Sequence, residues 1–501
     1  MDYLNALVKN LDNITYRRFK SHLLYKNKRE DTKNIILLEI IKTDDIVGLE
    51  TLYPAQKTNN GAYHALRKRL QDSLLQFLLV ENKQTQQQEI HLAQQYLNLG
   101  KWLIEQQLTA IAIKQIQKAE AIAIANEQFG VLNDIYQLQL QFAHAVPSWN
   151  IAHIGSALLK NQVRLMQEGK LHIAYAHIRA QIAQIQLKNS TINLTDLIQS
   201  TMKQYELNLS SALSYSSIYQ ILHIANEYAG IYQDFSLIDS YIQQSQSFLA
   251  SKKKLSQQQL YYRLYILYYL ANYYLRNKQF EQSKAYLQQM PELWQEHKVY
   301  QQQFELRHQM LLSLALYFSG ADKKAINIAL TALENAKKSN QSEDLADLHS
   351  CLVLYYSQTN QSACLKHLAQ LTQTDAWYEK RLGMLWVIRK NLMEIVVHAQ
   401  FQNTELALSR LVSFKRRYKQ FLKASNEQKV LDYIRLLEQL LQKTDLKFHS
   451  KYQEKVMAII ETQSNEDIFS ISFFAWIIAH WRGQNAHQIT LELMQNYKAQ
   501  A

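Results

Sequence analysis

The stretch LYYLANYYLRNKQFEQSKAYLQQM, residues 267–290, decides the fold of this chain. Apolar and aromatic residues recur at helical spacing on both sides of a short polar break, Arg-Asn-Lys-Gln at 276–279. A short break between two such segments predicts two helices that fold back on each other as an antiparallel pair. The segment therefore predicts a helical hairpin, and the same pattern returns further along the chain.

The amino-acid composition favours an all-α fold. Among 501 residues there are 10 glycines and 3 prolines, where average usage would give roughly 35 and 25. Sheets joined by tight hairpins and glycine-rich phosphate loops both need more glycine than this. Hydrophobic residues make up 47% and charged residues 20%, which is typical of a chain that folds.

Small residues follow the polar breaks at regular distances. The segments that show this are 267–290, 311–330, 351–368 and 394–411, and their small residues are Ser283, Ala325, Cys364 and Ala407. Two helices approach closely only where one of them presents a small side chain. The spacing of about 40 residues between these positions therefore predicts a series of similar helix pairs.

This alternation of bulky, small and aromatic residues resembles the tetratricopeptide repeat (TPR), most clearly over 270–415 and more loosely over 89–269. The resemblance implies an α-solenoid of stacked antiparallel helix pairs, a TPR-like superhelix. The period exceeds the usual 34 residues of TPR, so HEAT-like and other two-helix repeats also fit. A compact irregular helical fold is the remaining alternative.

Three parts are expected along the chain: an N-terminal helical module over 1–82, TPR-like repeats over 83–445 and C-terminal capping helices over 446–501. Polar breaks are predicted at NLGKW (98–102) and QEGK (167–170), among others. The most apolar run, IFSISFFAWIIAHW at 468–481, is shorter than the roughly 20 residues that span a bilayer. We expect it to form a buried helix that closes the array.

The crowded tyrosines of 261–274 have two interpretations. A helix inside a stack touches neighbours on two sides, and tyrosine can bury its ring while its hydroxyl stays near solvent. These tyrosines are therefore either solenoid core or an aromatic binding groove, and the two roles are compatible.

The TPR resemblance also implies a peptide-binding concave face. In that family the first helix of each pair holds peptides or C-terminal carboxylates. The positions that correspond here are Tyr265, Tyr268, Asn272, Arg276, Arg307, Tyr317, His349, Tyr356 and Arg389. Asn272 and Arg276 are four residues apart on one helix face and are candidates to hold a carboxylate. The alternative for Arg276 is a favourable interaction with the helix dipole.

No segment carries a catalytic signature. Glycine-rich phosphate loops, His-Glu-x-x-His, Cys-x-x-Cys and Gly-x-Ser-x-Gly are all absent from the sequence. We expect no catalytic residue, metal or cofactor, although distant residues can assemble a site without a motif. Cys351 and Cys364 are expected to be inert thiols in a reducing compartment. Without a secretion signal or a membrane span, the expected location is the cytoplasm.

The net charge of +12 makes a polyanion the second candidate partner. The basic cluster to test first contains Lys415, Arg416, Arg417, Lys419 and Lys423, which alternate with aromatic residues. The first functional expectation is a non-enzymatic scaffold that binds protein or peptide on its concave face. The alternative is a nucleic-acid-linked regulator with a basic front module and TPR-like sensor repeats, as in some bacterial regulators.

Overall fold

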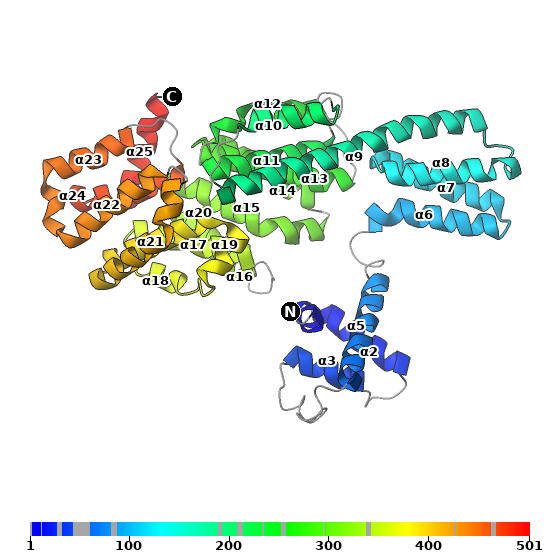
Figure 1. The fold of residues 1–501 in the computed structure, drawn as a ribbon, viewed down its shortest axis with the longest axis horizontal. Coiled ribbons are helices and arrows are strands. Elements are labelled where there is room, and N and C mark those ends of the chain that lie inside the picture. Colours follow the sequence, from blue (N-terminus) through cyan, green and yellow to red (C-terminus); the bar gives the residue numbers. More distant parts are fainter. Residues whose placement is uncertain are drawn as a thin grey trace. The chain divides into compact units, whose positions relative to one another are not determined.

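The fold is described from a computed structural model (Figure 1). The structure describes residues 3–11, 13–27, 33–43, 61–81, 88–188, 193–207, 214–232, 235–251, 257–295, 297–336, 342–424, 427–461 and 467–500. Two compact units divide the chain, residues 1–122 and 123–501. The expected domain boundaries near residues 82 and 445 stay predictions.

The first unit is helical throughout its described part. Its helices are α1 (Tyr3–Asn10), α2 (Asn13–Asn27), α3 (Lys33–Thr43), α5 (Gly61–Glu81), α6 (Gln88–Glu105) and most of α7 (Thr109–Ala125). One face of α5 buries an apolar stripe of Leu66, Leu70, Leu74 and Phe77 against α2 and α3. This apolar stripe is what fixes the front helices together.

The second unit contains the helix pairs. Its α-helices are α8 (Phe129–Phe142), α9 (Ile151–Lys188), α10 (Leu194–Gln204), α11 (Tyr215–Tyr232), α12 (Asp239–Ser251), α13 (Gln257–Arg276), α14 (Phe280–Trp294), α15 (Lys298–Phe318), α16 (Asp322–Ala336), α17 (Ser342–Gln358), α18 (Ala363–Leu368), α19 (Asp375–Leu382), α20 (Met384–Gln400), α21 (Thr404–Ala424), α22 (Gln428–Gln442), α23 (Ser450–Glu461), α24 (Ile468–Arg482) and α25 (Ala486–Gln500). Short 3-10 helices η2 (Ala143–Ala145), η3 (Ser236–Ile238) and η4 (Thr444–Phe448) complete it.

Stacked helix pairs confirm the predicted all-α, solenoid-like architecture. Each of α13, α15, α17 and α20, which we call the first helices, packs on the helix that follows it. The first three of them also contact the next first helix in the series. The described residues contain no strand. Ser283, Ala325, Cys364 and Ala407, the predicted small positions, are all completely buried. The small side chains therefore lie where the helices of each pair meet.

One turn geometry recurs after seven of the described helices. A residue in the left-handed region follows the helix at Gln107, Glu127, Glu206, Lys278, Gly320, Asn360 and Gln402. After α13, for example, Gln279 N–H donates to Tyr274 O at 2.8 Å and Lys278 N–H to Leu275 O at 3.1 Å. These two bonds satisfy carbonyls that a helix end leaves unpaired. Six of the seven residues are not glycine, so the low glycine content does not prevent regular turns.

Two predicted breaks are wrong. NLGKW lies inside α6, and QEGK lies inside α9, which continues for 38 residues. Glycine in a helix interior costs only about 1 kcal/mol, so a helix can continue through it. Gly100 has a packing reason to be small, because an added Cβ would lie 2.6 Å from Ile116 Cγ1 of α7.

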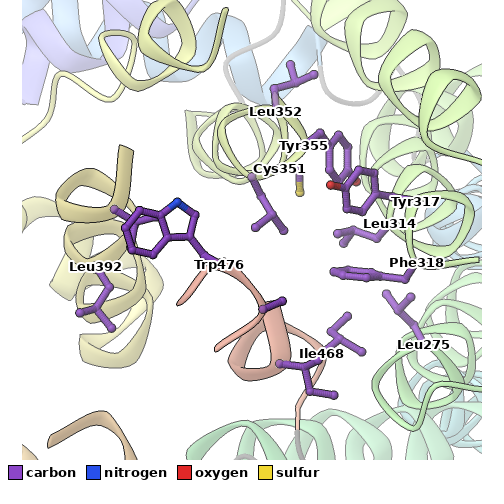
Figure 2. Packing of buried hydrophobic residues seen from close by; sticks show 14 of the residues in the cluster. Leu275, Leu314, Tyr317, Phe318, Cys351, Leu352, Tyr355, Leu392, Ile468 and Trp476 are labelled. Atoms are coloured by element: carbon purple, nitrogen blue, oxygen red, sulfur yellow. The ribbon is translucent and has the colours of Figure 1, made fainter. Parts of the chain in front are cut away.

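The apolar run at 468–481 forms the buried helix α24, as predicted. It covers the first helices of several repeats, since its residues and the preceding Asp467 reach α13, α17 and α20. Figure 2 shows Ile468 and Trp476 of α24 among Leu275, Phe318 and Leu392 from the first helices. Tyr317 and Tyr355 stack in the same core with ring centroids 4.1 Å apart.

Candidate functional site

The side chains that the first helices turn toward α24 form a surface that we call the first-helix wall. On α13 its members are spaced at 268, 272 and 276, and on α20 at 386, 389, 390 and 393. Spacings of three and four residues keep side chains on one face of a helix. A cavity of about 200 Å³ lies between this wall and Phe469 and Phe473 of α24.

The Asp467 carboxylate joins α24 to the two ends of the wall. Its side chain has no exposed surface. Arg276 Nε of α13 lies 3.0 Å from Asp467 Oδ1, and Arg389 Nη2 of α20 donates to Asp467 Oδ2 at 3.2 Å. Buried charges are tolerated when they are paired in this way. One carboxylate therefore bridges α13 and α20, which lie at the two ends of the first-helix wall.

Phe469 adds an aromatic contact to both arginines. The guanidinium carbon of Arg276 lies 5.0 Å from the Phe469 ring centroid and that of Arg389 lies 5.1 Å from it. Such cation–π contacts are strongest where water is excluded. Burial lowers the pKa of Arg276 to about 10 against the opposing effect of Asp467. Arg276 therefore remains cationic at neutral pH.

Asp347 is the titratable carboxyl group on the cavity wall. Trp386 Nε1 of α20 donates to its Oδ1 at 2.6 Å. Burial raises the pKa of Asp347 to about 7, even though the Trp386 bond opposes this shift. At neutral pH the cavity therefore contains a carboxyl group that is only partly ionised.

The structure brings four predicted residues together, because Tyr268, Asn272, Arg276 and Arg389 all line the cavity. Asn272 donates to Asn226 Oδ1 at 3.2 Å, so its amide links α13 to α11. Arg276 does hold a carboxylate, and that carboxylate belongs to the chain itself. Whether these residues bind a partner stays a prediction.

Tyr265 belongs to a tyrosine cluster on α11 and α13. We call this cluster the tyrosine section, and its members are Tyr219, Tyr261, Tyr262, Tyr265 and Tyr269. The Tyr265 ring centroid lies 5.0 Å from those of Tyr219 and Tyr261, and 4.7 Å from that of Phe304. All five tyrosines are half-buried, so part of each side chain faces outward.

Polar groups border the tyrosine section. Arg307 of α15 forms an ion pair with Asp344 at 3.1 Å, and Tyr269 shares a 2.8 Å hydrogen bond with His223 Nδ1. Burial, assisted by the charge of Arg179, lowers the pKa of His223 to about 4. This histidine is therefore neutral at pH 7 and adds no charge to the aromatic surface.

Three predicted residues lie elsewhere. Tyr317 is completely buried and donates to Gln358 Oε1 at 2.9 Å. His349 and Tyr356 gather around His367 of α18: the two histidine Nδ1 atoms are 3.2 Å apart, and Tyr356 stacks on His367. Tyr317 thus belongs to the core, and the other two face the second helix of their pair.

The predicted basic cluster lies on α21 and divides into two groups. Lys415 pairs with Glu438, and Arg417 pairs with Asp375 at 3.3 Å. The remaining members, Arg416, Lys419 and Lys423, are exposed and lie three and four residues apart. Among the described residues none of these three has an ion-pair partner. They form one exposed basic stripe along the helix.

Sequence reasoning missed Asp467, Phe469, Asp347 and Trp386. One signal was present for Asp467, because an aspartate directly before an apolar run is typical of a helix N-cap. That signal locates the start of α24. It does not reveal which distant cations will meet the carboxylate.

Comparison with known proteins gives no relative. No protein-family model matches the chain, and no curated protein matches it. Across the described ranges, no helix combines the length and the apolarity that a bilayer crossing requires. The same residues contain no group of three or more His, Cys, Asp or Glu side chains that could hold a metal ion.

Proposed function

We propose that this chain is a non-enzymatic, TPR-like helical-repeat scaffold that binds a peptide or protein segment at its tyrosine section. The observation that carries the proposal is the gathering of five half-buried tyrosines on α11 and α13, two helices that pack on each other. Tyrosine is favoured at binding surfaces because it offers a large rigid contact area and one hydrogen-bonding group. None of the five rings carries a charge that a partner would have to desolvate.

The way in which α24 is bound supports this proposal. The first-helix wall already holds one helix, through a buried carboxylate and an aromatic ring. Since Trp476, Ile477 and other large side chains of α24 are buried in the core, that helix is a permanent part of the fold. A partner would therefore use the tyrosine section, which stays half-exposed.

Peptides selected for binding to the purified chain test this function. Peptides that bind the wild-type chain should lose at least about tenfold in affinity on a Tyr261→Leu, Tyr265→Leu variant, because hot-spot tyrosines each contribute about 1–2 kcal/mol or more. Tyr25→Leu is the matched control, since Tyr25 is 89% exposed on another helix. Peptides that bind the double variant as tightly as the wild type would exclude the tyrosine section.

The exposed basic stripe of α21 favours nucleic-acid binding as the second candidate function. If Arg416, Lys419 and Lys423 each met a phosphate, affinity for a duplex of about 20 base pairs would fall about 40-fold from about 50 to about 200 mM salt. Replacing all three by glutamine should remove both the binding and its salt dependence. Fluorescence anisotropy measures this, and an affinity that is insensitive to salt would rule out the stripe as a phosphate contact.

A further inference from the structure

The cavity under α24 has the size and lining of a small-molecule site. Its volume of about 200 Å³ exceeds the roughly 150 Å³ of an engineered apolar cavity that binds benzene. Met310, Leu314, Met393 and Phe473 supply much of its apolar surface. Methionine side chains are flexible and polarisable, so they adapt to the shape of a bound ring.

Polar groups with unused hydrogen-bonding capacity also line this cavity. The described residues provide no hydrogen-bond acceptor for the two terminal nitrogens of Arg276, and its Nε contacts Asp467 without hydrogen-bond alignment. The Tyr268 hydroxyl likewise forms no hydrogen bond with any described residue. Neither the terminal nitrogens of Arg276 nor the Tyr268 hydroxyl is among the fully buried unsatisfied atoms, so each remains accessible to a bound molecule. Both are donors, so a suitable ligand presents acceptor oxygens.

The charges around the cavity favour an anion beside Arg276. The carboxylate of Asp467 is shared between Arg276 and Arg389, so Arg276 receives only part of its negative charge. Lys390 also lines the cavity, but Asp375 and Glu394 pair with it at 3.1 and 3.6 Å. An incompletely balanced guanidinium on a partly buried wall forms a charge-assisted hydrogen bond with a carboxylate.

Asp347 is the one lining group that could oppose an anion. Its raised pKa of about 7 keeps the carboxyl protonated in part of the molecules at neutral pH. The protonated form carries no charge and can donate a hydrogen bond. Asp347 therefore weakens the preference for an anion only in part.

We propose that this cavity binds a small organic carboxylate with a ring-sized apolar body. The carboxylate would meet Arg276, and the Tyr268 hydroxyl would donate to the same group. The apolar body would pack against Met310, Met393 and Phe473. By comparison with the benzene cavity, this volume fits a ligand of roughly eight to ten non-hydrogen atoms. The site lies under α24 and shares no lining residue with the tyrosine section.

Calorimetry with the full chain and three matched probes tests the charge requirement. Phenylacetate, phenylacetamide and phenethylamine share one ring and differ in the charge of the attached group. We expect phenylacetate to bind with a Kd below about 1 mM, at least about tenfold tighter than the neutral amide. Equal affinity for acid and amide, tighter binding of the amine, or no binding of phenylacetate would each overturn the proposal.

Two variants test the location. Arg276→Met should weaken phenylacetate binding at least about tenfold and leave the amide nearly unchanged, whereas Arg416→Met, an exposed arginine of α21, should change neither. Leu314→Phe fills the cavity without touching the arginines and should abolish binding of both probes. Because Leu314→Phe keeps the Asp467 ion pairs, it remains informative if Arg276→Met does not fold. Phenylacetate binding that survives Leu314→Phe would place the ligand elsewhere.

Discussion

The two halves of helix α13 present very different surfaces. Its first half contributes Tyr261, Tyr262 and Tyr265, whose side chains remain partly exposed. Its second half ends at Arg276, which Asp467 and Phe469 cover. The two halves share one helix and one helical period, so periodicity alone does not decide which part is covered.

Charge explains the difference between the two halves. A guanidinium that is buried by its neighbours needs a counterion, and the chain supplies one from a distant segment. Tyrosine carries no charge, so a half-exposed tyrosine surface is stable without a partner from the same chain. The covered half is therefore structural, while the open half can accept another molecule.

The largest loss of unfolding free energy is expected from a change at the covered half of α13. Asp467→Ala would remove the carboxylate that Arg276 and Arg389 share, and breaking a buried ion pair costs about 3–5 kcal/mol of unfolding free energy. Urea denaturation of the purified chain measures this loss. Asp467→Asn keeps the shape of the side chain and removes only its charge, so it is the control for the contribution of the charge. A loss below about 1 kcal/mol for Asp467→Ala would mean that the two arginines remain solvated.

The second effect concerns the pH dependence of stability and arises at Asp347 of α17, which lines the same cavity as the covered half of α13. In the unfolded chain Asp347 loses its proton near its ordinary pKa of 3.8, whereas in the folded chain its pKa is about 7. The contribution of this group to the unfolding free energy therefore falls as pH rises between these values, by on the order of 2–4 kcal/mol, and then stays constant.

Asp347→Asn tests this pH effect. Trp386, Arg307, Asp344 and Glu343 face the carboxyl from α20, α15 and α17 and remain unchanged in the variant. Asparagine can still accept the Trp386 hydrogen bond. The variant should raise the melting temperature more at pH 8 than at pH 4, and an equal change at both would contradict the raised pKa.

A smaller loss of unfolding free energy is expected from a change in the tyrosine section. Tyr219→Leu removes one ring from the tyrosine section, and because this ring is half-exposed the loss should be about 1 kcal/mol. The same variant should also bind more weakly any peptide that was selected for binding to the wild-type chain. A destabilisation as large as that of Asp467→Ala would show that the tyrosine section is core.

The smallest effect is expected at a turn of the kind that also ends α13. Gln402 follows α20 with φ of 62°, a conformation that favours glycine. Gln402→Gly should stabilise the chain by about 0.5–1 kcal/mol, and Gln402→Val should destabilise it. Thermal denaturation of the two variants checks the sign, and a loss of stability on Gln402→Gly would contradict the turn geometry.

The sequence predicted the helix pairs well because their packing depends on local patterns. Small residues such as Ser283 and Ala407 repeat at regular distances, and each lies where two helices meet. The mistaken breaks at 98–102 and 167–170 arose from treating glycine as a helix end, when Gly100 is small to allow close packing with Ile116.

The candidate site was predicted only in part, for a physical reason. Arg276, Asn272 and Arg389 follow from the period of the first helices, so their common face was predictable. The partner of the two arginines was not, because no local pattern relates Asp467 to them. The same limit applies to Asp347, whose raised pKa depends on burial by several helices and not on its neighbours in sequence.

The ion pairs of Asp467 also constrain how this protein is made. Ribosomes release a chain from its amino end, so α13 to α20 emerge before α24, and Asp467 follows Arg389 by 78 residues. Until α24 has been synthesised, Arg276, Arg389 and the apolar side chains around them are not covered by this helix. Nascent chains that stall in this interval would expose the apolar side chains and the two arginines of the first-helix wall. Chaperones shield exposed surfaces of this kind.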